Sequence, residues 1–120
     1  TQLKDILPVC CLEVEDLVES TEGFAAVATE AGKRIFKNID FETMPPILGY
    51  NKTLALDEAE ILLKVRETED PLLAVRAYGK GRVLAYTSDP APHWGCNFVF
   101  WNQYNDFWLK CLAWVRGKIS

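Results

Sequence analysis

The sequence predicts an α/β chain that is rich in strands, contains an antiparallel hairpin and closes with a C-terminal helix. Two apolar runs flank Gly79-Lys80-Gly81, and glycine supplies the positive backbone angles of a tight turn, so residues 72–78 and 82–88 are predicted to pair. An amphipathic run over residues 102–116 predicts the helix. With 120 residues, 49% of them hydrophobic, the chain is long enough for one globular core.

Shorter elements are predicted before the hairpin. Residues 9–14 alternate apolar and polar side chains, as a half-buried strand does, and residues 23–29 predict a second extended piece. Residues 32–46 predict a loop that lies over a surface, because Pro45 and Pro46 forbid regular strand pairing. Residues 47–56 continue the strand pattern, whereas residues 59–67 fit either a strand or a helical turn.

The predicted closing helix has one broad apolar face. On a wheel of 3.6 residues per turn this face collects Trp101, Tyr104, Phe107, Trp108, Cys111, Leu112, Trp114 and Val115. Asn102 is expected to cap the start of the helix, and Gly117 is expected to end it. So clean an amphipathic pattern favours packing against a sheet over a surface on which a ligand stacks.

The charge balance argues against a nucleic-acid-binding protein. Thirteen basic and seventeen acidic side chains give a net charge of −4 without a block of like charge. Arg76, Lys80 and Arg82 near the hairpin are interpreted as solvated charges at a strand edge. We find neither an apolar stretch long enough for a bilayer nor a signal-like start, so we expect a cytoplasmic chain whose partners are proteins or small molecules.

The cysteines predict neither disulfides nor a metal site. Cys10, Cys11, Cys96 and Cys111 show no Cys-x-x-Cys spacing, and we expect them to be reduced and mostly in the core. His93 and Cys96 stand three positions apart, but neither a second histidine nor paired thiols complete a tetrahedral set. No metal and no cofactor are therefore predicted.

The segment SDPAPHWG, residues 88–95, holds the only histidine and follows the predicted hairpin directly. One interpretation places Asp89, His93 and Trp94 at the carboxyl end of a sheet strand, where open α/β folds bind ligands. Tyr50 and Asn51 are predicted to line the same edge.

The alternative interpretation of this segment is structural. Pro90 and Pro92 would fix the path of a stiff loop, and Asp89 would accept hydrogen bonds from backbone amides. His93 and Trp94 would then fill the gap beside the closing helix. The residues themselves leave both interpretations open.

Several stretches carry a resemblance to a known family: DILPV at residues 5–9, MPPILGYN at 44–51, PLLAVRAYGKGRVLAYTSDPAPHWG at 71–95 and FWNQYNDFWLKCLAWV at 100–115. In this order they resemble the C-terminal half of the glutamine amidotransferase-like proteins, a branch of the class I glutamine amidotransferase-like superfamily. The resemblance implies a flavodoxin-like α/β fold. Residues 1–120 would be the C-terminal portion of a single domain, and most parallel strands would belong to an N-terminal half that is missing here.

The chemistry of a glutamine amidotransferase needs a cysteine on a strained turn, an imidazole, a carboxylate that orients the imidazole, and donors for the oxyanion. The resemblance gives His93 a position comparable to the family's histidine. However, Trp94 and Gly95 follow it where the family usually has Pro-Glu, and no cysteine lies in a glycine-bounded turn. The chain by itself therefore lacks a complete catalytic triad.

Two classes of function remain. The favoured one is a non-catalytic binding or assembly module. The other is a hydrolase or amide transferase whose nucleophile lies on a missing N-terminal half and that uses His93. We expect the chain to be ordered only in contact with that N-terminal half or with a second copy of itself, because its apolar faces would otherwise lack cover.

Overall fold

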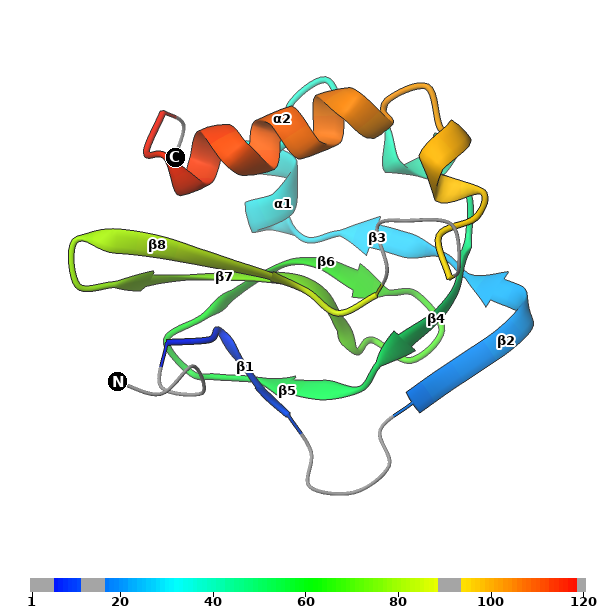
Figure 1. The fold of residues 1–120 in the computed structure, drawn as a ribbon, viewed down its shortest axis with the longest axis horizontal. Helices are drawn as coiled ribbons and strands as arrows, with labels where there is room; N and C mark the ends of the chain where they lie inside the picture. Colours follow the sequence, from blue (N-terminus) through cyan, green and yellow to red (C-terminus); the bar gives the residue numbers. More distant parts are fainter. Residues whose placement is uncertain (1–5, 12–16, 89–93, 119–120) are drawn as a thin grey trace.

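The computed structural model describes residues 6–11, 17–88 and 94–118 and shows a strand-rich α/β chain with antiparallel sheets and a C-terminal helix (Figure 1). Its elements, in chain order, are β1 (Val9–Cys11), β2 (Leu17–Phe24), β3 (Ala26–Ala28), α1 (Glu30–Ile35), the 3-10 turn η2 (Phe41–Thr43), β4 (Ile47–Asn51), β5 (Thr53–Ala55), β6 (Glu60–Val65), β7 (Pro71–Tyr78), β8 (Gly81–Tyr86), the 3-10 turn η3 (Phe98–Phe100) and α2 (Tyr104–Val115). Within the described ranges, every helix is too short or too polar to cross a membrane.

The main sheet has four strands in the order β3-β6-β7-β8, and each neighbouring pair is antiparallel. The predicted hairpin is confirmed: Tyr78 pairs with Gly81, and Gly79 takes the positive φ of 58° that the turn requires. The segment that fitted either a strand or a helical turn is strand β6, which pairs with both β3 and β7.

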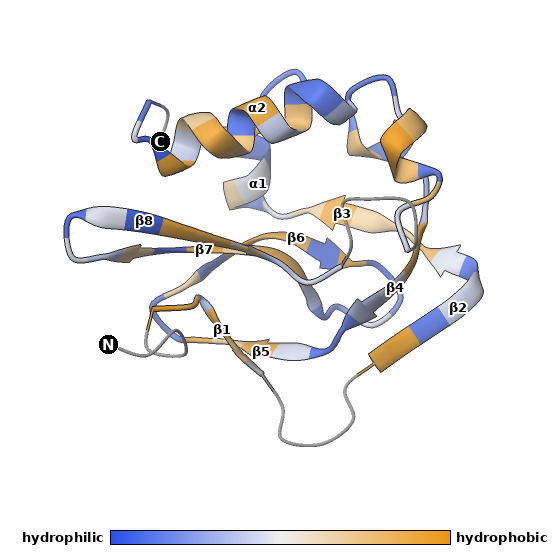
Figure 2. Ribbon diagram, in the orientation of Figure 1, coloured by the Kyte–Doolittle hydropathy of each residue, from blue (hydrophilic) through white to orange (hydrophobic). Residues whose placement is uncertain are grey.

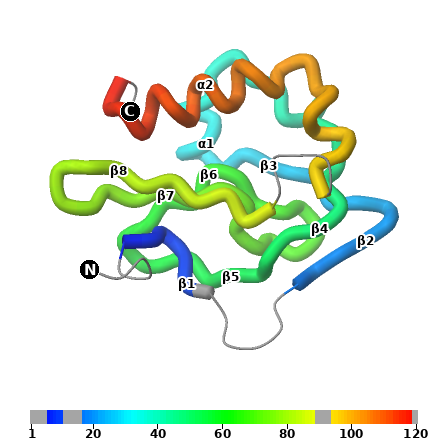
Figure 3. Tube along the Cα trace, viewed as in Figure 1, coloured from blue at the N-terminus to red at the C-terminus, as the bar shows by residue number. Residues whose placement is uncertain are grey.

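Two small sheets flank the main one. β1 pairs with β5, and β2 pairs with β4 (Figure 3). The sequence prediction missed all but the end of β2, whose exposed side chains are largely polar. The extended piece predicted over residues 23–29 is in fact the end of β2 and all of β3, because Gly23 has a φ of 86° and the chain changes sheets there.

The loop predicted over residues 32–46 is wrong in its first part, which belongs to helix α1. The Thr29 hydroxyl caps this helix by accepting the Gly32 N–H at 3.1 Å. Gly32 stands inside this helix because the helix packs closely on β6. A Cβ at this position would come within 2.1 Å of the Leu62 carbonyl oxygen. The same region also contains η2, which Asp40 caps in the same way.

The closing helix is confirmed as α2, although its predicted cap is not. The residue before the helix is Gln103, not Asn102, and it makes no side-chain capping bond. Gln103 instead accepts the Asp40 N–H at 2.8 Å and donates to the Asn38 carbonyl at 3.0 Å. Gly117, with a φ of 75°, follows the last turn as predicted.

The core lies between α2 and the main sheet (Figure 2). From α2 it buries Phe107, Cys111 and Trp114, and the helix lies against β8. The apolar face predicted for this helix is broader than the buried one, because Leu112 and Val115 are 58% and 39% exposed.

Candidate functional site

Strand β4 is hydrogen-bonded to Ser88 and to Trp94, which stand before and after the predicted site residues Asp89 and His93 in the sequence. Asp89 and His93 lie outside the described residues, but their described neighbours are anchored to β4. The Ser88 hydroxyl donates to the Gly49 carbonyl at 2.5 Å, and the Leu48 N–H donates to the Trp94 carbonyl at 2.8 Å. Ser88 and Trp94, the described residues on either side of segment 89–93, are therefore both bonded to β4.

The Trp94 side chain is seated against a glycine of this strand. A Cβ at Gly49 would lie 2.7 Å from two atoms of the indole ring, so only glycine admits the ring at this distance. The indole N–H donates to the Glu19 carboxylate on β2 at 3.0 Å. Trp94 is only 8% exposed, so most of its ring serves packing between β2 and β4.

An open hollow of about 410 Å³ borders the remaining edge of this ring, and it is lined by Glu19, Ser20, Thr21, Leu48 and Trp94. Its walls offer a carboxylate, two hydroxyls and one indole edge. The exposed lining is mostly apolar, so its few polar groups would orient a bound ligand rather than surround it.

Tyr50 points away from this hollow and into the core. Its hydroxyl donates to Asp70 at 2.6 Å and lies 2.7 Å from the Thr68 hydroxyl, while Lys52 pairs with Asp70 at 2.9 Å. Burial, together with the hydrogen bond to Asp70, raises the pKa of Tyr50 to about 12. Burial opposes ionisation of Asp70, but hydrogen bonds from Lys52, Tyr50 and Thr68 outweigh it and lower the pKa of that carboxyl.

Asn51, the next residue of β4, has an exposed side chain, and its N–H donates to the Thr87 carbonyl at 2.8 Å. Because side chains alternate along a strand, Tyr50 and Asn51 face opposite sides. The described candidates thus do not share one surface: Trp94 borders the hollow, Tyr50 is buried and Asn51 faces solvent. Contact of these residues with a ligand stays a prediction.

The cysteines whose side chains are described differ in environment. Cys111 is buried in α2, Cys96 is half-buried and Cys10 is exposed on β1, which corrects the expectation that most lie in the core. Burial raises the pKa of the Cys111 thiol to about 12, so it carries essentially no thiolate at neutral pH. None of the three has a positive φ, whereas a nucleophile on a sharp strand-to-helix turn sits on strained backbone.

Two arginines predicted as solvated edge charges have structural roles instead. Arg82 donates to the Trp114 carbonyl at 2.8 Å, and its guanidinium lies 4.7 Å from the centre of the Trp114 ring. Arg76 pairs with Glu58 at 3.1 Å, and only 15% of its side chain is exposed. Arg82 therefore satisfies a carbonyl at the end of α2 and ties β8 to that helix.

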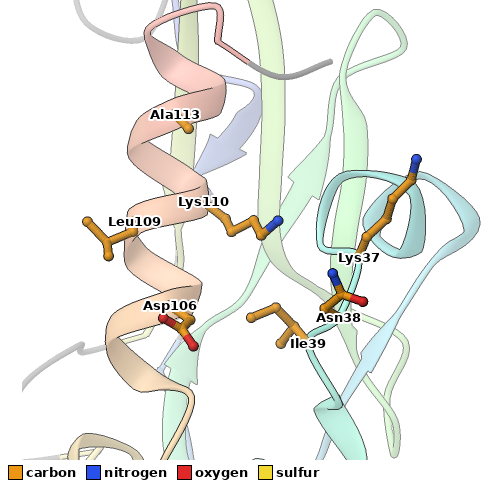
Figure 4. Close-up of a pocket in the computed structure, with 7 residues that line it drawn as sticks. All are labelled: Lys37, Asn38, Ile39, Asp106, Leu109, Lys110 and Ala113. Atoms are coloured by element: carbon orange, nitrogen blue, oxygen red, sulfur yellow. The ribbon is translucent and has the colours of Figure 1, made fainter.

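A second hollow, of about 360 Å³, lies between α2 and the segment that follows α1 (Figure 4). It is lined by Lys37, Asn38, Ile39, Asp106, Leu109, Lys110 and Ala113. The Lys110 side chain points toward segment 37–39, whereas Leu109 points away from it. Among the residues that the structure describes, no group of three His, Cys, Asp or Glu side chains could hold a metal ion.

Sequence reasoning missed Glu19, Gly49 and Asp70. A glycine inside a strand often marks a close approach, so Gly49 carried a usable signal. Glu19 and Trp94 are 75 positions apart, and Asp70 is 20 positions from Tyr50, so no local pattern could have paired them.

Comparison with known proteins identifies the family. The family described as "Putative glutamine amidotransferase" matches residues 1–117. No curated protein was found to match the chain. Among solved structures, a cytoplasmic protein from Salmonella typhimurium, STM3548, is 34% identical with a TM-score of 0.85; the match covers 94% of this chain and 45% of that one.

A second solved structure, the cytoplasmic protein STM1381 from Salmonella typhimurium LT2, is 38% identical with a TM-score of 0.86. This match covers 96% of the present chain and 46% of the other. The chain thus spans less than half the length of either protein. With the family matched from residue 1 to residue 117 and both similar structures superposing on nearly the whole fold, the chain belongs to the glutamine amidotransferase-like family.

Proposed function

We propose that this chain is the C-terminal portion of a flavodoxin-like glutamine amidotransferase-like domain and that it acts as a non-catalytic binding or assembly module. The proposal includes a cytoplasmic location, which the names of both similar Salmonella proteins support. It also includes a small-molecule ligand at the edge of β4 and a protein surface that completes the domain.

The observation that carries the proposal is the environment of the cysteines. Amide transfer from glutamine needs a thiolate held beside an imidazole and facing the oxyanion donors. Cys111 is buried within α2, and its raised pKa removes the thiolate. Cys10 lies on strand β1 and Cys96 in the turn before η3, both without the strained backbone of a nucleophile.

Binding, in contrast, has a physical basis at the β4 edge. The hollow is bordered by Trp94, whose ring is held by Gly49 and Glu19, and by Ser20 and Thr21 of β2. Asp89 and His93 belong to the segment whose described ends meet this strand. A ligand in the hollow would contact Trp94, one of the predicted site residues.

Ammonia release from L-glutamine by the purified 120-residue chain tests the non-catalytic part of the proposal. We expect no release above the buffer background, in wild type and in Cys96→Ser alike. Cys96→Ser is the matched control because Cys96 is the cysteine closest in sequence to His93. Steady release that disappears in His93→Ala or in Cys96→Ser would overturn the proposal.

A second function is supported by one fact, namely that the similar structures are about twice as long as this chain. A hydrolase or amide transferase could hold its nucleophile on an N-terminal half and use His93 from this one. The same assay on the protein produced from its full reading frame separates the two: ammonia release lost in His93→Ala supports the enzyme, and its absence in wild type supports the module.

A further inference from the structure

We propose that the outer edge of β3 binds a short peptide with a free ammonium group and a free carboxylate, held in the hollow between this strand and η2. The site goes beyond the proposed function, which concerns the edge of β4. Among the described residues, this hollow of about 310 Å³ shares no lining residue with the hollow beside Trp94. Its volume is at the lower end of the range for ligand pockets, about 300 to 1,000 Å³, so the ligand must be small.

The hollow lies along the edge of β3 and not against one face of the sheet. It is bordered by Ala26, Val27 and Ala28, three consecutive residues of this strand. Because successive side chains of a strand point to opposite faces, a space that touches all three residues lies beside the backbone. The opposite wall is segment 39–42, which includes the start of η2, and η2 contacts β3.

The backbone of β3 points hydrogen-bonding groups toward this hollow. The Thr29 N–H, directly after the strand, donates to the Leu62 carbonyl of β6 at 3.0 Å. Because the bonding side alternates along an antiparallel strand, the N–H and C=O groups of Ala28 and Ala26 point away from β6. In the described sheet β3 pairs with β6 alone, so these outward groups have no strand partner there.

An extended peptide unit is the complement of such an edge. It offers a C=O and an N–H that can continue the sheet, as in the recognition of peptides by strand addition. Ala26 is only 6% exposed, so water competes little for the bonds that its backbone can make. Because β3 has three residues, the edge can pair with a short ligand only.

The hollow is lined by charges of both signs. Arg66 stands beside the start of β3, because its N–H donates to the Ala25 carbonyl at 2.9 Å, and Glu42 stands on the opposite wall. Both side chains are exposed, and neither forms an ion pair among the described residues. Lys33, which also borders the hollow, is instead paired with Glu30 at 3.7 Å.

These charges determine which peptide fits. A guanidinium group binds a carboxylate through two parallel hydrogen bonds, so Arg66 is assigned to the carboxylate of the ligand. Glu42 is assigned to the ammonium group, because the neighbouring Asp40 already accepts the Glu42 N–H at 3.0 Å. Exposed ion pairs are individually weak, so we expect millimolar affinity and selectivity for a ligand that makes both pairs.

An NMR titration of the isotope-labelled protein, produced from its full reading frame, tests the site with the dipeptide alanyl-alanine as the probe. We expect saturable shifts of the Ala26 and Ala28 amide signals, because both amides point toward the hollow. The indole N–H of Trp94 borders the other hollow and should not shift. Absence of a saturable shift at Ala26 and Ala28, or a shift at Trp94 alone, would overturn the proposal.

Arg66→Gln tests the contact assigned to the carboxylate of the probe. It should weaken the binding of alanyl-alanine at least about fivefold, because a charged hydrogen-bonding partner is lost. Arg34→Gln is the matched control, since Arg34 is also exposed but does not border this hollow. The control should bind the probe like wild type. Equal affinities of the two variants would contradict the assignment.

A blocked probe tests the other end of the ligand. N-acetyl-alanyl-alanine lacks the ammonium group, so wild type should bind it at least about fivefold more weakly than alanyl-alanine. Glu42→Gln should abolish this difference, because it removes the carboxylate assigned to the ammonium group. If wild type binds both probes equally, or if Glu42→Gln keeps the preference, the proposed recognition of a peptide with both ends free is wrong.

Discussion

The indole ring of Trp94 and the backbone of Gly49 are packed so closely that a single methyl group at residue 49 would reach 2.7 Å from the ring. This contact sets the distance between β4 and Trp94. It also aims the indole N–H at Glu19 on β2. The position of Trp94 in the candidate site thus depends on the absence of a side chain at Gly49.

Gly49→Ala should displace Trp94 and break its hydrogen bond to Glu19. We expect the free energy of unfolding, measured with urea on the protein from its full reading frame, to fall by about 1 to 3 kcal/mol. Gly81→Ala is the matched control, because a Cβ there meets only the Tyr78 carbonyl oxygen at 3.6 Å. The control should stay within about 0.5 kcal/mol of wild type; equal effects of the two variants would disprove the close contact.

Tyr50→Phe removes the buried hydroxyl that bonds to Asp70 and Thr68. The carboxylate of Asp70 then keeps Lys52 but loses one donor, so the free energy of unfolding should fall by about 1 to 3 kcal/mol. Tyr78→Phe, at a partly exposed ring, should change it by less than about 0.5 kcal/mol. A neutral effect of Tyr50→Phe would mean that the hydroxyl bonds contribute nothing.

Asp70 gives the protein an acid-sensitive element. Despite its burial, hydrogen bonds from Lys52, Tyr50 and Thr68 lower the pKa of this carboxyl below 3.8 in the folded state. The stabilisation is therefore complete above the unfolded-state value of about 4 and is lost as the pH falls through the folded-state pKa. Asp70→Asn should flatten the fall in unfolding free energy below pH 4, whereas Asp57→Asn, on an exposed turn, should not.

Arg82→Ala should loosen the end of α2, because it removes the bond to the Trp114 carbonyl and the contact with the Trp114 ring. The expected loss in the free energy of unfolding is about 1 to 2 kcal/mol. Arg82→Lys keeps the charge without the planar guanidinium and should fall in between. Lys80→Ala, in the exposed turn of the hairpin, should leave stability unchanged; a loss as large as that of Arg82→Ala would point to a general charge effect.

His93→Ala separates the two interpretations of segment 88–95. A structural plug should lower the free energy of unfolding by about 1 to 3 kcal/mol through lost packing. A ligand-binding histidine should leave the thermal midpoint nearly unchanged. The melt of this variant beside wild type therefore decides which interpretation holds.

Elements whose signals are local could be predicted from the sequence. The glycines around Lys80 specified the hairpin, and the periodicity of residues 102–116 specified α2. α1 was missed because residues 32–46 were interpreted as one loop on account of Pro45 and Pro46, while the reason for Gly32, the close Leu62 carbonyl, lies 30 positions away. The sequence identified the apolar residues of α2, but it could not show that Leu112 and Val115 among them are exposed, because that depends on which neighbours pack against the helix.

The candidate site was less predictable than the fold. Trp94 and Tyr50 were predicted to line a ligand site, yet their hydrogen-bond partners Glu19 and Asp70 lie far away in the sequence and are brought to them only by the fold. Arg82 was interpreted as a solvated charge because the end of α2 is far away in the sequence. Hydrogen bonds between such distant elements are a property of the tertiary structure, which no local spacing encodes.

Light scattering on the 120-residue chain alone, at micromolar concentration, tests most directly the proposal that this chain is one part of a larger domain. Strand β8, the last strand of the described sheet, and the exposed Leu112 and Val115 predict a dimer, a higher oligomer or an aggregate, because edge strands and apolar surface associate in water. Leu112→Asp should shift the chain toward smaller species. A monodisperse monomer that melts cooperatively would contradict the account.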